Sequence, residues 1–126
     1  MSRNFDMVYI HVQFSVKYRN RYLNAQALKV LRDFIWEHSK DRDYTVLAAN
    51  GYLNHFHILL KPRLKNPISK ILKEIKGTSS HYLRQKGIVQ KDFSWQQGFS
   101  AFSVSPGQVQ EKINYIKNQY DHHSKY

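Results

Sequence analysis

The residues whose types and spacing could support chemistry begin with the segment His55-Phe56-His57. Side chains two positions apart on a strand point to the same side, so both imidazoles could reach one metal ion. Phe56 and Ile58 would then face the core. Pairs of packed or surface histidines share this spacing, so the segment alone is compatible with either a metal site or a structural role.

A second candidate is Tyr115, near the C-terminal end. At about 100° per residue, the apolar residues of this region form one packed helical stripe that consists of Val109, Ile113, Ile116 and Tyr120. Tyr115 and Gln119, spaced i and i+4, lie side by side about a third of the circumference away from that stripe. Packing in the core therefore does not explain why a tyrosine stands at position 115, although exposed tyrosines on helices are common.

The N-terminal half predicts the elements that position the histidines. Residues 8–16 alternate strictly between apolar and polar, which predicts a strand with Val8, Ile10, Val12, Phe14 and Val16 on one face and Tyr9, His11, Gln13 and Ser15 on the other. Helical spacing predicts a helix from about Ala25 to Lys40. Residues 44–49 and 54–60 predict an antiparallel hairpin with its turn at Asn50-Gly51 and its end at Pro62. His11 could border a site, but a structural or surface role is favoured.

The second half predicts two further helices and a strand. Asn66, as the N-cap, and Pro67 begin a helix that Gly87 ends. Residues 99–104 predict the last strand. Ser105 then predicts the start of a helix, as an N-cap that is followed by a proline at the first helical position. Val104 and Val109 have the spacing of a hydrophobic staple, a contact that is typical of helix N-termini. The order strand, helix, strand, strand, helix, strand, helix predicts an α+β domain with a ferredoxin-like antiparallel sheet, and we expect a single domain over residues 1–126.

Charge points to nucleic acid as a partner. The chain of 126 residues has 20 Lys and Arg against 9 Asp and Glu, a net charge of +11 and a pI near 9.9. Four cations of one helix face, Lys70, Lys73, Lys76 and Arg84, form either a solvated surface or a phosphate-facing one, and their single sign favours the latter. A basic stretch after the first strand, Lys17, Arg19 and Arg21, adds candidate DNA contacts.

Other composition features exclude several classes of protein. The sequence has no cysteine, so neither disulfides nor thiolate zinc sites are available. It has no apolar run of the roughly 20 residues that span a membrane, and its start has no signal-peptide core. We therefore expect a soluble cytoplasmic protein.

Five segments, in this order and spacing, resemble one family over nearly the whole chain, the single-tyrosine HUH transposases of small bacterial insertion sequences. The segments are Val16-Lys17-Tyr18-Arg19, the Asn50-Gly51 turn before His55-Phe56-His57-Ile58-Leu59-Leu60, Ile75-Lys76-Gly77-Thr78-Ser79-Ser80, Trp95-Gln96-Gln97-Gly98-Phe99, and Tyr115-Ile116-Lys117-Asn118-Gln119. The sequence departs from many relatives at Asn54, where they have an acid before the first histidine.

The resemblance implies that Tyr115 is a nucleophile and that His55, His57 and the amide oxygen of Gln119 bind Mg²⁺ or Mn²⁺. It further implies a homodimer that binds hairpins in single-stranded DNA. Such an enzyme would cleave and rejoin the strand through a 5′-phosphotyrosine, without a nucleotide cofactor. Both placements of the tyrosine helix, over its own sheet or over the partner's, are compatible with the sequence.

Two alternatives share these residues. One is a domesticated relative that processes chromosomal repeat hairpins by the same chemistry. The other, from a different class, is a non-catalytic module that binds nucleic-acid hairpins and uses Tyr115 and the histidines structurally. The sequence alone fixes neither the target sequence nor the physiological metal.

Overall fold

The computed structural model of the chain describes residues 8–17, 23–42, 44–63 and 66–119. Their elements, in chain order, are β1 (Tyr9–Ser15), α1 (Ala25–Ser39), β2 (Tyr44–Tyr52), β3 (His55–Pro62), α2 (Ile68–Gln85), β4 (Ser100–Val104), the 3₁₀ helix η2 (Pro106–Gln108) and α3 (Val109–Lys117). This order confirms the βαββαβα arrangement predicted from periodicity.

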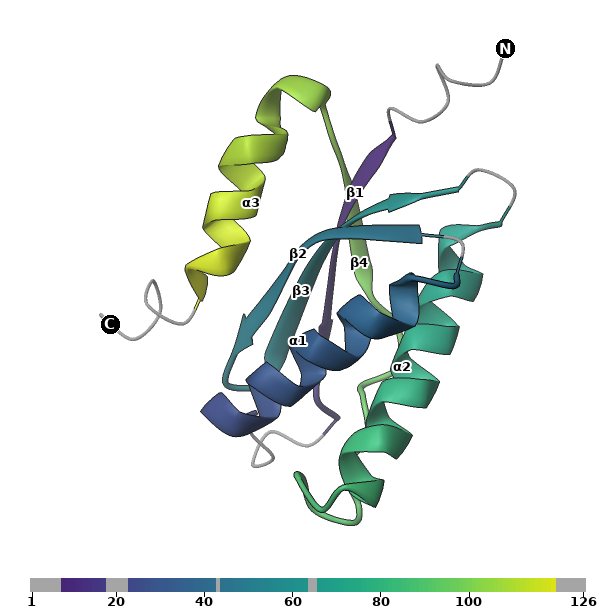
Figure 1. Cartoon of the computed structure of the whole chain (residues 1–126), viewed down its shortest axis with the longest axis vertical. Coiled ribbons are helices and arrows are strands. Elements are labelled where there is room, and N and C mark those ends of the chain that lie inside the picture. Colours follow the sequence, from purple (N-terminus) through teal and green to yellow (C-terminus); the bar gives the residue numbers. More distant parts are fainter. Residues whose placement is uncertain (1–7, 18–22, 43, 64–65, 120–126) are drawn as a thin grey trace.

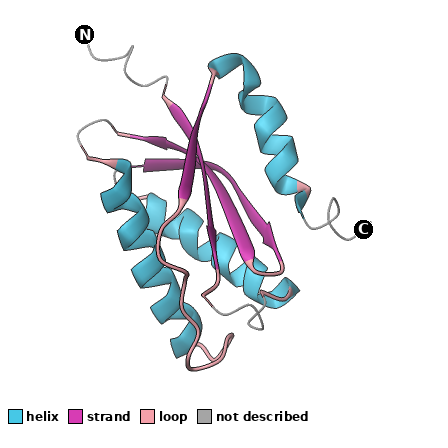
Figure 2. Cartoon of the chain, turned by 180° about the vertical axis from the view of Figure 1, so that it is seen from behind, coloured by secondary structure: helices cyan, strands magenta, loops and turns pink. Residues whose placement is uncertain are grey.

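The four strands form one antiparallel sheet in the order β2-β3-β1-β4 (Figure 1). This is the strand order of a ferredoxin-like fold, so the predicted α+β class is confirmed. Strands β1 and β3 lie at the centre and are hydrogen-bonded on both sides, which holds their side chains at fixed positions. Helices α1 and α2 cover one face and α3 lies against the other (Figures 1 and 2).

Strand alternation divides the apolar side chains into two cores. Val12, Phe14 and Val16 of the first strand point into the larger core with residues of α1 and α2, and Tyr9 packs against a smaller core under α3. The buried members of the smaller core are Ala48, Leu59, Val104 and Ile116. The predicted polar face of β1 therefore lies on the α3 side of the sheet.

The hairpin turn does not lie where the sequence predicts it. Asn50 and Gly51 belong to β2 and pair with His57 and Phe56, and the chain turns at Leu53-Asn54. Leu53 adopts the left-handed conformation with φ 55°. A Cβ on Gly51 would lie 2.2 Å from the carbonyl oxygen of His55, so the glycine permits close approach of two strands and does not form a turn.

The helix ends agree with the sequence in part. Gly87, at φ 69°, follows the end of α2 as predicted, but Pro67 and not Asn66 occupies the N-cap, without a side-chain cap bond. Val104 and Val109 do pack in the same small core. Helix α3 ends at Lys117, so Gln119 lies after the helix. Tyr120, the last member of the predicted stripe, lies outside the described residues.

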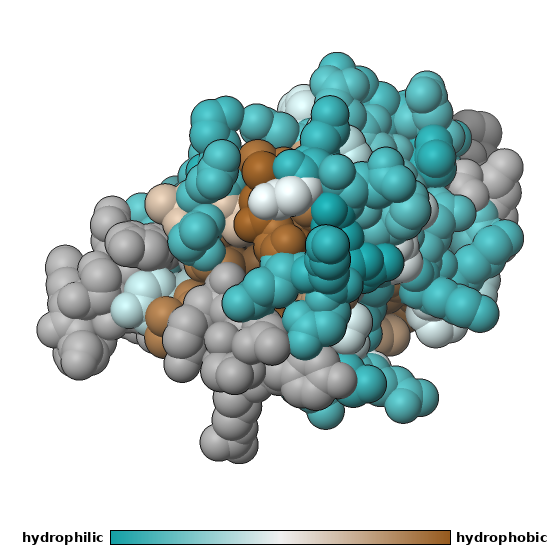
Figure 3. All heavy atoms as spheres, turned by 90° about the horizontal axis from the view of Figure 1, so that it is seen from below, coloured by the Kyte–Doolittle hydropathy of each residue, from teal (hydrophilic) through white to brown (hydrophobic). Residues whose placement is uncertain are grey.

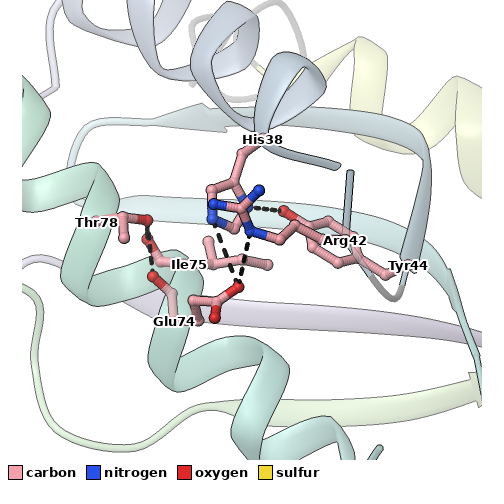
Figure 4. A network of polar contacts seen from close by, with 6 residues as sticks. All are labelled: His38, Arg42, Tyr44, Glu74, Ile75 and Thr78. Atoms are coloured by element: carbon pink, nitrogen blue, oxygen red, sulfur yellow. Dashed lines mark hydrogen bonds and ion pairs between the residues drawn. The ribbon is translucent and has the colours of Figure 1, made fainter. Parts of the chain in front are cut away.

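A polar network joins α1 to α2 (Figure 4). The His38 Nδ1 and Tyr44 Oη atoms are 2.6 Å apart, and Glu74 Oε1 lies 3.3 Å from Arg42 Nε and 3.6 Å from His38 Nε2. Burial, ahead of the charge of Arg42, lowers the pKa of His38, and burial likewise raises that of Tyr44. When both side chains are neutral, the Tyr44 hydroxyl can donate a hydrogen bond to Nδ1 of His38. The proton of His38 then lies on Nε2 and points toward Glu74.

In the view from below (Figure 3), most of the coloured surface is hydrophilic, and apolar residues are visible mainly near the centre with a few toward the lower edge. Within the ranges that the structure covers, no helix has the length and apolarity needed to cross a bilayer.

Candidate active site

The two histidines of the candidate site lie on the α3 side of β3. His55 and His57 pair across the sheet with Ser15 and Gln13 of β1. Their ring centroids are 6.4 Å apart with an interplanar angle of 30°. His57 is buried and His55 is half-buried. Strand alternation predicted that both imidazoles share one side, and this placement is confirmed.

His11 joins this pair from the neighbouring strand. The distance between His11 Nε2 and His57 Nδ1 is 2.9 Å, so one ring donates a hydrogen bond to the other. Burial, followed by the positive charge of Lys112, lowers the pKa of His11 to about 4. A neutral His11 therefore orients the ring of His57 at neutral pH. Sequence reasoning favoured a structural or surface role for it, because the partner strand of β1 was not known.

Tyr115 faces the histidines of its own chain. Its ring centroid lies 6.3 Å from that of His57 at 85° and 6.4 Å from that of His11 at 68°. The Nζ atom of Lys112 lies 5.4 Å from the centre of the tyrosine ring. The tyrosine side chain is 42% exposed, so an incoming group can reach it. Lys112, one turn earlier on α3, is a member of this cluster that the sequence did not single out.

Gln119 has a different environment. Its side chain is completely buried, and its Nε2 atom lies 3.5 Å from the backbone oxygen of Tyr115. Imidazole nitrogens and an amide oxygen are donors that divalent cations accept, and three such donors leave positions for water and phosphate. The chemistry of His55, His57 and Gln119 thus fits a cation. Among the described residues, no cluster of three or more His, Cys, Asp or Glu could bind a metal by itself.

The end of the tyrosine helix is attached to the sheet by Asn50. The Nδ2 atom of Asn50 donates to the backbone oxygen of Lys117 at 2.8 Å, and its Oδ1 accepts from Arg32 Nη1 at 2.9 Å. These three residues line a cavity of about 570 Å³ beside the edge strand β2. Asn50 pairs with His57 across the strands, so one residue connects α1, the histidine strand and α3. Sequence analysis assigned Asn50 to a turn and missed this contact.

The predicted DNA-contact residues separate into groups. Lys70 and Lys73 are exposed on α2, which covers the sheet face opposite the histidines, and Lys17 is exposed after β1. Lys76 Nζ instead donates to the backbone oxygens of Gln96 and Gly98, each at 2.7 Å, and Arg84 Nη1 donates to that of Phe93 at 2.8 Å. Arg19 and Arg21 lie outside the described residues.

Fold and site together define a small α+β protein in which paired strand histidines face a tyrosine on the C-terminal helix. The family model described as "Transposase IS200 like" matches residues 4–119. The chain therefore belongs to the family of IS200-like transposases.

Two solved structures share its fold. A proposed transposase from Deinococcus radiodurans R1 is 20% identical, with a TM-score of 0.69, and the match covers 89% of this chain and 90% of that chain. A REP-associated tyrosine transposase bound to a REP hairpin is 19% identical, with a TM-score of 0.69, covering 94% of this chain and 69% of that one. The comparison with curated proteins gave no significant match.

Proposed function

We propose that this protein is a DNA transposase that binds hairpins in single-stranded DNA and cleaves and rejoins the strand through Tyr115. The observation that carries this proposal is the position of the exposed Tyr115 ring, 6.3 Å from that of His57 and edge-on to it, within one chain. Family membership supplies the reaction class.

In the proposed step the Tyr115 oxygen attacks the scissile phosphorus and loses its proton. The bond from phosphorus to the tyrosine oxygen forms, the bond from phosphorus to the 3′ oxygen breaks, and that oxygen takes up a proton. The DNA 5′ end is then held as a phosphotyrosine, and a 3′ hydroxyl can reverse the step without a nucleotide cofactor. Lys112, beside the tyrosine ring, would attract the scissile phosphate by its charge.

His55, His57 and Gln119 would hold a divalent cation, Mg²⁺ or Mn²⁺, whose chemistry is to polarise the phosphate and stabilise the leaving oxygen. His11 supports this role because it engages Nδ1 of His57, so that ligation would use Nε2. We also propose a homodimer, since one small domain offers little surface for both a hairpin and a cleavage site. A monomer by light scattering that retains full cleavage would contradict the dimer.

The test is to incubate the protein with a single-stranded hairpin oligonucleotide and Mg²⁺ or Mn²⁺, and to look for an adduct that survives denaturation. Tyr115→Phe should abolish the adduct yet keep metal affinity, hairpin binding and, within about 0.5 kcal/mol, stability. His57→Ala should abolish cleavage with reduced metal affinity. An adduct that Tyr115→Phe retains, or that mass spectrometry maps elsewhere, would identify another nucleophile.

A second candidate is the processing of repeated chromosomal hairpins by the same chemistry. The observation that favours this candidate is the shared fold with a REP-associated tyrosine transposase that was solved with a REP hairpin bound. Genomic neighbours test this: flanking repeats that fold as hairpins, without element ends, would support the second candidate.

A further inference from the structure

The α3 side of the sheet is covered only in part. Helix α3 packs on the small core, whereas the same side continues past His57 to Gln13 and Ser100, which pair with each other across β1 and β4. Gln13 is half-buried and Ser100 is exposed. A strip of polar sheet surface therefore extends from the tyrosine and histidine rings toward the loop before β4.

That loop closes the strip with a small cavity. The cavity has a volume of about 230 Å³, and its lining residues include Gln13, Ser15, Gln96, Gln97 and Ser100. Among the described residues, no protein group forms a hydrogen bond with the side chains of Gln13 or Gln97. Each amide can both donate and accept, which suits the edge of a nucleobase.

The cavity wall is fixed in place by bonds to both layers of the fold. Lys76 Nζ donates to the backbone oxygens of Gln96 and Gly98, and the backbone N–H of Gln96 donates to Ser15 at 2.7 Å. Gly98 has φ 90°, a conformation that favours glycine. The loop is thus a built part of the surface next to the histidines.

An exposed aromatic ring lies beside His11, two residues along β4 from the cavity residue Ser100. Phe102 is 56% exposed, pairs with His11 across the strands, and its ring lies 6.2 Å from that of His11. Residues 100 and 102 of one strand point to the same side, so Phe102 and the cavity share the strip. An exposed ring on a basic protein is a platform on which an unpaired base can stack.

We propose that this strip binds the unpaired bases next to the scissile phosphate, with one base stacked on Phe102 and its neighbour held by the amides of Gln13 and Gln97. The inference rests on the proposed function and adds to it a protein surface that selects the bases at the cut. A base stacked on Phe102 would lie beside His11 and Tyr115, at the place where the phosphate must be presented.

The test measures binding in the uncleaving Tyr115→Phe background, with a DNA hairpin that has or lacks a short unpaired extension. Phe102→Ala should lower the affinity gained from the extension about tenfold or more. Trp36→Ala is the matched control, because Trp36 is 54% exposed but lies on α1, on the opposite face of the sheet. Gln97→Ala should reduce discrimination among the four bases at one position of the extension.

Four outcomes separate the possibilities. Quenching of 2-aminopurine in the extension by the parent protein, lost in Phe102→Ala, supports stacking. If the unpaired extension adds the same affinity in Phe102→Ala as in Trp36→Ala, the inference is overturned. It is also overturned if Phe102→Ala changes only the oligomeric state, because the ring is then covered by a second copy of the chain and not by a base. If the protein with Tyr115 intact forms no adduct although binding still depends on Phe102, the proposed function is contradicted. The proposed base-binding site is then still supported.

Discussion

At the scale of single residues, His11, His57, Tyr115 and Lys112 form a contiguous cluster within the candidate site. His11 and His57 are joined by a hydrogen bond, Tyr115 stands edge-on to both, and Lys112 lies over the tyrosine ring. The two imidazoles come from the two central strands, which are the least free to move. Tyr115 and Lys112 come from one turn of α3, so any shift of that helix moves the proposed nucleophile and the lysine together.

Lys112→Gln should slow adduct formation about tenfold, the loss expected when one charged contact to a phosphate is removed. Lys112→Arg should retain most of the rate, since the charge remains. Single-turnover kinetics at saturating DNA measure this step apart from binding. Equal rates in the parent protein and Lys112→Gln would mean that the lysine only packs against the ring.

At the scale of elements, the attachment of α3 to the sheet depends on Asn50. Asn50→Ala removes the bond to the Lys117 oxygen and leaves Arg32 without its amide partner. We expect faster hydrogen exchange at the amides of residues 113–117 and a lower cleavage rate. Thr45→Ala, an exposed change on the same strand, is the control. Unchanged exchange in Asn50→Ala would show that apolar packing alone holds the helix.

The basic residues of α2 should separate by function. Lys70→Gln and Lys73→Gln should each lower the slope of log affinity against log salt by about one, with stability unchanged within about 0.5 kcal/mol. Lys76→Gln should in addition lower the free energy of unfolding by about 1 kcal/mol or more, because it releases two carbonyls of the loop. Salt titrations and urea unfolding check the two effects, and identical behaviour of all three variants would contradict this division.

The sequence predicted those features that depend on neighbours along the chain. The two-residue spacing of His55 and His57 predicted that both histidines share one side of a strand, and the helical spacing of the last helix placed Tyr115 off the packed stripe. Features that depend on which strands pair could not be predicted in the same way. His11 meets His57 only through the β1–β3 register, and the Asn50-Gly51 pair has the composition of a turn although Gly51 serves close strand contact. Lys112 became a candidate only once α3 was placed on the sheet.

At the scale of the whole molecule, protonation of buried histidines links stability to pH. The folded-state pKa of His38 lies below its unfolded value of about 6.5, so the unfolded chain binds more protons as the pH falls below that value. The stabilising effect is fully present above about pH 6.5 and is lost as the pH falls toward the folded pKa. His11 acts with the same sign, toward about pH 4.

The free energy of unfolding should therefore decrease as the pH is lowered from about 6.5, and His38→Gln should decrease less steeply over the same range. Urea titrations of both proteins at a series of pH values give the two slopes. Parallel curves would show that His38 does not contribute to the acid sensitivity.

The division of the apolar interior into a large and a small core has a consequence for how activity is lost. The larger core joins the sheet to α1 and α2, whereas α3 is nine residues long and packs over a cluster in which four described side chains are buried. Isolated helices of that length are marginal in water. Gentle heating should thus release α3 as a cooperative unit of its own while the remaining layers stay folded. In that partly melted form the histidines would stay in place on the sheet while Tyr115 moves away from them, so under the proposed function the protein would still bind the DNA strand but no longer cleave it.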